Sequence, residues 1–140
     1  MTIHGFTDGA ARGNPGPGGI GIVLRSESGE TLLKEKKYLG KVTNNVAEYS
    51  ALIECLLQFT ELRARNKISC TRLVMHSDSE LMVRQLNGQY KVKDRELKKL
   101  YDKVRELIHG LQIEFSIMHV PRELNREADA LANDSIDEQP

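Results

Sequence analysis

The sequence contains no tryptophan and only two cysteines among 140 residues, and aromatic side chains make up 5% of it. Neither Cys55 nor Cys70 belongs to a Cys-x-x-Cys pair or a Cys/His cluster, so we expect two reduced thiols rather than a disulfide or a zinc site. No apolar run approaches the roughly 18 residues of a membrane span, and Met1–Asp8 lacks the features of a signal peptide. We therefore expect a protein without a membrane anchor that resides in the cytoplasm.

The sequence also lacks an excess of charge of either sign, because 20 Lys and Arg residues balance 20 Asp and Glu residues. Net charge alone thus gives no indication of a nucleic-acid partner. Basic residues nevertheless cluster in the segments 34–41 and 91–99. Each cluster is expected to be a solvated surface unless a functional site lies beside it.

The chain length fits one domain, spanning residues 1–140. Hydrophobic residues make up 39% and charged residues 29% of the chain, as is typical of a folded globular protein. No internal repeat, linker or low-complexity segment divides the sequence. We therefore expect all the motifs below to belong to a single site.

Hydrophobic periodicity predicts three strands joined as a meander, followed by amphipathic helices that alternate with two further strands. This order is typical of an α/β fold with one mixed sheet, whose later strands are parallel and whose faces carry helices. The expected strands are Thr2–Asp8, Ile20–Arg25, Thr31–Leu39, Arg72–His76 and Leu111–Val120, with a turn rich in Gly and Pro over Ala10–Gly19. The expected helices are Asn44–Arg65, Ser79–Leu86, Asp94–His109 and Asn125–Ile136.

Four acidic residues occupy positions that a purely structural account does not explain together. Asp8 ends the first strand, and Asp78 follows the fourth, where a lone aspartate is better explained as a helix cap. Glu48 and Asp129 each lie on a helical stripe that should face the core, and a charge there needs a partner. One such carboxylate is commonly part of a buried ion pair, but four are better explained by a bound cation.

The chemistry of an oxygen-only cluster indicates the kind of cation. Carboxylates without cysteine select hard ions such as Mg²⁺ or Mn²⁺, and carboxylates held close together repel one another unless ions neutralise them. A pair of such ions can activate a water and stabilise a departing oxygen in an in-line displacement. Hydrolysis of a phosphodiester is the natural reaction of such a site.

The residues around these carboxylates carry a family resemblance. The segment Phe6–Gly19, which reads Phe-Thr-Asp-Gly-Ala-Ala-Arg-Gly-Asn-Pro-Gly-Pro-Gly-Gly, resembles the opening signature of ribonuclease H type 1 proteins. Three further segments follow in the family's order, namely Thr43–Glu48, His76–Ser79 and Asn125–Ala132. The match extends over nearly the whole chain, from the first motif to the last, and the long opening segment is specific.

The resemblance implies the ribonuclease H-like fold, a five-stranded mixed sheet flanked by helices, and a metal-dependent endonuclease. Such an enzyme cuts the RNA strand of an RNA/DNA hybrid, leaves 5′-phosphate and 3′-hydroxyl ends, and recognises RNA by its 2′-hydroxyls. The implied ligands of two Mg²⁺ ions, for which Mn²⁺ substitutes, are Asp8, Glu48, Asp78 and Asp129. The implied substrate contacts are Asn14, Asn45 and the backbone near Gly9 and Ala10 on the RNA side, and Thr43 and Asn44 on the DNA side.

The sequence departs from the best-known bacterial form at three points. It is similar to a shorter variety that lacks a basic handle between the middle helices and an added hybrid-binding domain, so substrate binding should depend more on lysines such as Lys91 and Lys98. Glu80 stands where many relatives have Gln, and a carboxylate can accept from a ribose hydroxyl but cannot donate. His119 and Arg122 are the two candidates for a residue that assists the carboxylates.

Three alternatives remain open on the sequence alone. A non-catalytic hybrid-binding module of the same fold is the first, although such copies usually lose an acidic residue. Another enzyme of the superfamily, such as an integrase, a resolvase or a reverse-transcriptase-associated domain, is the second, and a purely structural or protein-interaction role is the third. We further expect a monomer, with double-stranded RNA as a possible additional substrate.

Overall fold

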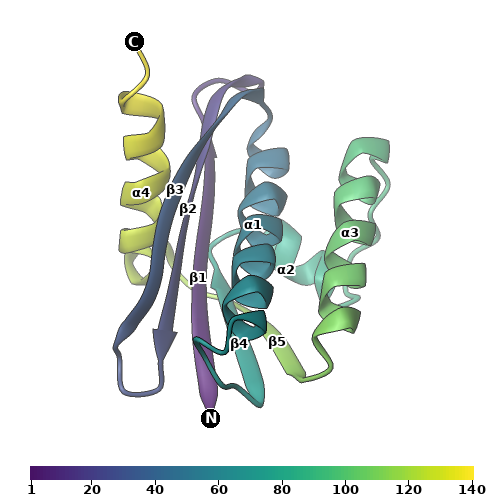
Figure 1. The fold of residues 1–140 in the computed structure, drawn as a ribbon. Helices are drawn as coiled ribbons and strands as arrows, with labels where there is room; N and C mark the ends of the chain where they lie inside the picture. Colours follow the sequence, from purple (N-terminus) through teal and green to yellow (C-terminus); the bar gives the residue numbers. More distant parts are fainter.

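The computed structural model describes all of residues 1–140 and contains one five-stranded sheet with helices on both faces (Figure 1). The strands lie in the order β3-β2-β1-β4-β5. The strands are β1 (Thr2–Ala11), β2 (Gly16–Ser26), β3 (Thr31–Val42), β4 (Arg72–Ser77) and β5 (Glu114–His119). The helices are α1 (Asn44–Ala64), α2 (Glu80–Leu86), α3 (Arg95–Leu111), the 3₁₀ turn η1 (Arg122–Leu124) and α4 (Arg126–Asp137).

The sheet combines antiparallel and parallel pairs, as the element order predicts. Strands β1, β2 and β3 form an antiparallel meander, whereas β4 pairs in parallel with both β1 and β5. The connections from β1 to β4 and from β4 to β5 pass through helices, as parallel neighbours require. The predicted fold class, a mixed sheet flanked by helices, is confirmed.

The helices divide the structure into three layers. Helices α1 and α3 lie on one face of the sheet and α4 lies on the other (Figure 1). The α1 layer holds the main core, in which Tyr49 and Phe59 of α1 are fully buried with Ile3 and Leu24 of the sheet. The α4 layer is thinner, and α4 packs on β2 through buried Ala128 and Ala132. No helix is both long and apolar enough to cross a bilayer.

Local signals fix where two of the helices begin. The Thr43 side chain accepts a hydrogen bond from the Val46 backbone N–H and caps α1, and the Ser79 side chain accepts from the Met82 N–H and caps α2. Asp78 is therefore free of the capping role that a lone aspartate before a helix suggests. Helix α2 ends at Asn87–Gly88, where Gly88 has a positive φ of 77°.

Two predicted boundaries are wrong. The turn predicted over Ala10–Gly19 occupies only residues 12–15, because β1 continues to Ala11 and β2 begins at Gly16. Gly18 and Gly19 pair with β1 despite the weak strand propensity of glycine. The last strand does not begin at Leu111, which is instead the buried final residue of α3. An apolar residue at a helix end and one at a strand start cannot be distinguished by period alone.

Candidate active site

Three of the four predicted carboxylates meet at one point of the structure. Asp8 of β1, Glu48 of α1 and Asp78 after β4 each offer an oxygen, and these oxygens all lie within 4.8 Å of one another. Asp8 and Glu48 are buried and Asp78 is half-buried. The three residues come from separate parts of the chain and are brought together only by the tertiary fold.

Strand pairing accounts for the meeting of the two aspartates. Strands β1 and β4 are parallel neighbours, and Thr7 is the register partner of Ser77. Asp8 and Asp78 each come one residue later, so they lie side by side where β4 ends and β1 continues. Ligands in α/β folds bind at the carboxyl ends of parallel strands, and this site follows that rule.

A close approach of α1 to β1 brings in Glu48. A methyl group at Gly9 would overlap the backbone of Ala47 and the nitrogen of Glu48, so only glycine allows the helix to lie so near the strand at this point. The Gly9 backbone N–H donates a hydrogen bond of 2.9 Å to Oε1 of Glu48. This bond fixes the Glu48 carboxylate beside Asp8.

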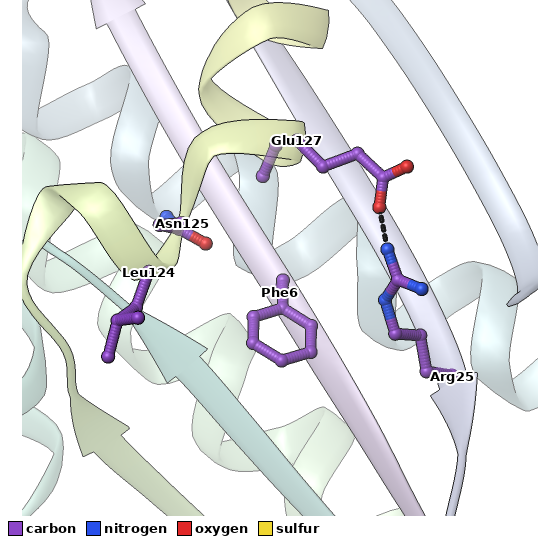
Figure 2. Close-up of a pocket in the computed structure, with 6 residues that line it drawn as sticks. Phe6, Arg25, Leu124, Asn125 and Glu127 are labelled. Carbon is purple, nitrogen blue, oxygen red and sulfur yellow. Dashed lines mark hydrogen bonds and ion pairs between the residues drawn. The ribbon is translucent and has the colours of Figure 1, made fainter. Parts of the chain in front are cut away.

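Asp129 enters from α4 on the opposite face of the sheet. It lines the same cleft as Asp8, and its side chain is 27% exposed. The start of α4 is held to β1 by buried Asn125, whose amide donates a 2.9 Å hydrogen bond to the Thr7 carbonyl oxygen. Figure 2 shows Asn125 at the beginning of α4, next to β1. The fourth predicted carboxylate therefore borders the same site.

The electrostatics of the cluster are those of carboxylates that lack a counterion. Burial raises the pKa of Asp8 far above its usual range, and the carboxylates of Glu48 and Asp78 raise it further. Burial, followed by repulsion from Asp78, raises the pKa of Glu48 to about 8, even though the Gly9 N–H stabilises its ionised form. No lysine or arginine forms an ion pair with Asp8, Glu48 or Asp78, whereas Arg122 lies 3.5 Å from Asp129. The protein therefore supplies no basic side chain that neutralises Asp8, Glu48 or Asp78.

The carboxylates line an open cleft of about 470 Å³. The cleft is predominantly polar, with only two hydrophobic residues among the eleven that line it. Eight of them are predicted site residues, namely Asp8, Gly9, Ala10, Asn44, Glu48, Asp78, Arg122 and Asp129. The other three, Ala11, Arg12 and Asn133, were not singled out from the sequence.

The remaining predicted residues lie around this cleft rather than in its wall. Asn14 is exposed, and its side-chain oxygen accepts a 3.0 Å hydrogen bond from the Asn44 backbone N–H, which joins the β1–β2 turn to the start of α1. Thr43 and Asn45 flank Asn44 at the same helix start. Glu80 is exposed on α2 and forms an ion pair with Arg84 at 3.3 Å.

The structure separates the two candidates for an assisting residue. Arg122 lies in the cleft wall next to Asp129, as described above. His119 is the exposed last residue of β5 and does not line the cleft. Of these two candidates, only Arg122 is placed to act on a group bound at the carboxylates.

A second, smaller pocket lies on the α4 side of the sheet (Figure 2). It has a volume of about 110 Å³ and is bounded by Phe6 of β1 and Leu124 of η1, among others. Its charged residues, Arg25 and Glu127, form an ion pair with each other. This pocket has no unpaired charge and no cluster of ligating groups, so the chemistry belongs to the larger cleft.

Comparison with known proteins agrees with this geometry. A family described as "Reverse transcriptase-like" matches residues 6–135. The crystal structure of LC11-RNase H1 in complex with RNA/DNA hybrid is similar with a TM-score of 0.90 and 43% sequence identity, over 97% of each chain. RNase H1 from the halophilic archaeon Halobacterium salinarum is similar with a TM-score of 0.87 and 38% identity, over 99% of this chain and 100% of that one. The chain belongs to the type 1 ribonuclease H family.

Sequence relatives of this ribonuclease H domain are longer than the chain itself. "Ribonuclease HI" of Halobacterium salinarum is 39% identical over 136 residues, which is 97% of this chain and 65% of the relative. The "Bifunctional protein Rv2228c" of Mycobacterium tuberculosis is 41% identical over 131 residues, which is 93% of this chain and 34% of the relative. The chain thus spans about two thirds of one relative's length and about one third of the other's.

Proposed function

We propose that this protein is an endonuclease that hydrolyses the RNA strand of RNA/DNA hybrids. The observation that carries the proposal is the meeting of Asp8, Glu48 and Asp78 within 4.8 Å in an open polar cleft, with no basic residue paired to them. Its substrate is supported by similarity to a ribonuclease H1 that was crystallised with an RNA/DNA hybrid. The expected products carry 5′-phosphate and 3′-hydroxyl ends.

The donor set fits a hard divalent metal. Carboxylate oxygens without sulfur or imidazole ligands are the environment that Mg²⁺ and Mn²⁺ prefer. Burial and mutual repulsion raise the pKa values of Asp8 and Glu48, so their ionised forms are disfavoured unless a cation lies beside them. Asp8, Glu48, Asp78 and Asp129 would hold two Mg²⁺ ions or, in their place, Mn²⁺. When bound, such ions supply an activated water and stabilise the charge on the scissile phosphate and the leaving oxygen.

The residues around the carboxylates would bind and orient the hybrid. Asn14 and Asn45, with the backbone at Gly9 and Ala10, would face the RNA strand, and Thr43 and Asn44 the DNA strand. The hydrogen bond between Asn14 and the Asn44 N–H links these two groups, so the two strands would be recognised by one rigid unit. Arg122 would hold a phosphate oxygen at the cleft wall.

A cleavage assay tests the proposal directly. The purified protein is incubated with a labelled RNA/DNA hybrid, double-stranded RNA and single-stranded RNA, with Mg²⁺, with Mn²⁺ and with chelator. Asp8→Asn serves as the inactive control, and Glu114→Gln, an exposed change on β5 away from the cleft, as the matched active control. We expect metal-dependent cutting of the hybrid's RNA by the wild type and by Glu114→Gln only.

The same assay separates the proposal from its rivals. Binding of the hybrid without cutting, in either metal, would identify a non-catalytic hybrid-binding module. Cutting of double-stranded RNA by the wild type, but not by Asp8→Asn, would add a second substrate. This arm is included because Glu80 stands where many relatives have Gln, which changes a predicted contact to the ribose. We also propose that the protein acts as a monomer, which gel filtration coupled to light scattering would check.

A further inference from the structure

Asn133 and Arg12 line the active-site cleft without having been predicted to belong to it. Asn133 lies one helical turn after Asp129 on α4, and Arg12 follows Asp8 by four residues in the turn after β1. Both are within hydrogen-bond distance of each other, and Asn133 also reaches Asp129. They form a chain of side-chain contacts that runs from Arg12 through Asn133 to the Asp129 carboxylate.

Asn133 holds Asp129 at two points. Its side-chain amide nitrogen donates to the Asp129 carbonyl oxygen at 3.0 Å and to Oδ1 of the Asp129 carboxylate at 3.3 Å. Residues four apart on a helix are neighbours on its surface, so this contact is compatible with regular helix geometry. The amide restricts the rotation of a carboxylate that is only half-buried and has a competing partner in Arg122.

Arg12 in turn holds Asn133. Its Nη2 donates to Oδ1 of Asn133 at 3.3 Å and lies 3.4 Å from the Asn133 carbonyl oxygen, while Nη1 forms an ion pair with Asp137 at 2.6 Å. The guanidinium therefore bridges two turns of α4 from the strand side. Because Oδ1 of Asn133 accepts from Arg12, the side-chain amide turns its nitrogen toward Asp129. A carboxylate accepts hydrogen bonds, so this is the orientation in which Asn133 can donate to it.

We propose that Asn133 and Arg12 are positioning residues that set the Asp129 carboxylate relative to Asp8 for metal binding. The inference rests on the proposed function of the cleft and adds to it the residues that orient its fourth carboxylate, Asp129. Hydrogen-bond partners of metal-ligating carboxylates act in this way, and their loss typically costs about 10-fold to 100-fold in metal affinity or activity. The effect should appear in metal binding and turnover rather than in substrate affinity.

The test compares Asn133→Ala, Asn133→Asp and Arg12→Ala with a matched control, Lys36→Ala. Lys36 also ties the sheet to the end of α4, through Glu138, but it does not line the cleft. Binding of Mn²⁺ alone is measured by calorimetry, melting temperature by circular dichroism, and kcat and KM on a labelled hybrid. Asn133→Asp keeps the shape of the side chain but cannot donate, and it brings a second charge next to Asp129.

We expect Asn133→Ala and Arg12→Ala to weaken Mn²⁺ binding and lower kcat by about 10-fold each, with KM within about twofold of the wild type. Asn133→Asp should be at least as impaired, and Lys36→Ala should match the wild type in Mn²⁺ affinity and kcat. Unchanged Mn²⁺ affinity in Asn133→Ala overturns the proposal. So does an Arg12→Ala variant with a raised KM, a weaker salt dependence and normal Mn²⁺ binding, because it identifies a direct phosphate contact.

The calorimetric arm keeps the two proposals distinguishable. If the wild type binds Mn²⁺ but cuts no hybrid, the proposed function fails, and the comparison of Mn²⁺ affinities still decides whether Asn133 and Arg12 position Asp129. If hybrid is cut but the affinities of all four variants equal that of the wild type, only the positioning role fails.

Discussion

At the scale of single residues, Asp8 is the group on which the site depends most. It lies beside Glu48 and Asp78 in the cleft that Asp129 also lines, and the residue is only 4% exposed. Replacement by Asn keeps the shape of the side chain and removes one carboxylate oxygen and the negative charge. We expect Asp8→Asn to lower kcat on the hybrid by about 10³-fold, the order of effect of removing a principal electrostatic group from an active site, as measured in single-turnover assays. Activity within tenfold of the wild type would contradict this assignment.

The same residue governs how stability depends on pH when no metal is bound. The pKa values of Asp8 and Glu48 are raised in the folded protein, so folding retains protons that the unfolded chain releases near pH 4. Stability must therefore fall as pH rises from the unfolded pKa toward the folded one, which is about 8 for Glu48. We expect the chelated wild type to lose about 1–3 kcal/mol between pH 5 and pH 8 in urea denaturation.

The matched variant makes this pH prediction specific. Asp8→Asn removes one of the repelling carboxylates, so in chelator at pH 8 it should be more stable than the wild type by about 1–2 kcal/mol. Added Mg²⁺ should stabilise the wild type and have little effect on the variant, because ligand binding to the folded state raises stability by mass action. A variant that is less stable than the wild type in chelator would show that repulsion among the carboxylates does not destabilise the folded protein.

At the scale of elements, the approach of α1 to β1 is the feature that creates the site. Gly9 is the contact point, and a methyl group there overlaps the backbone of α1. We expect Gly9→Ala to destabilise the protein by about 1–3 kcal/mol, as overpacking does, and to reduce activity more than that loss explains, because Glu48 moves away from Asp8. Gly110→Ala is the control, since a methyl group there meets no atom. A Gly9→Ala protein with wild-type activity and stability would contradict this, because it would show that α1 can move away from β1 without loss of either.

The elements were largely predictable from sequence because each has a strong local signal. Thr43, Ser79 and Asn87–Gly88 mark helix ends, and period-2 patterns mark the strands. The site was predictable for a different reason, since Glu48 and Asp129 break an apolar stripe and the surrounding motifs resemble a known family. Asn133 and Arg12 could not be found in this way, because a polar residue on a helix surface and an arginine in a turn are ordinary, and only the tertiary fold places them together.

At the scale of the whole molecule, the balance of charge hides an uneven distribution. The cleft is acidic, whereas the exposed segment 91–99 before and within α3 is basic. We expect the paired reversal of Lys91 and Lys98 to Glu to raise KM for the hybrid several-fold and to flatten the dependence of KM on salt, because each phosphate contact releases counterions. Steady-state assays across salt concentrations measure this. An unchanged KM would mean that the hybrid is held by other residues.

The topology also determines when the carboxylate cleft can form during synthesis of the chain. β1 is the central strand, yet its parallel neighbour β4 follows it by 70 residues, from Thr7 to its partner Ser77, and the last carboxylate is at position 129. A chain emerging from the ribosome can form the β1–β3 meander early, but it cannot close the sheet or complete the cleft until most of the domain has been made. A nascent chain therefore carries no assembled carboxylate cleft until the segment that contains Asp129 has left the ribosome.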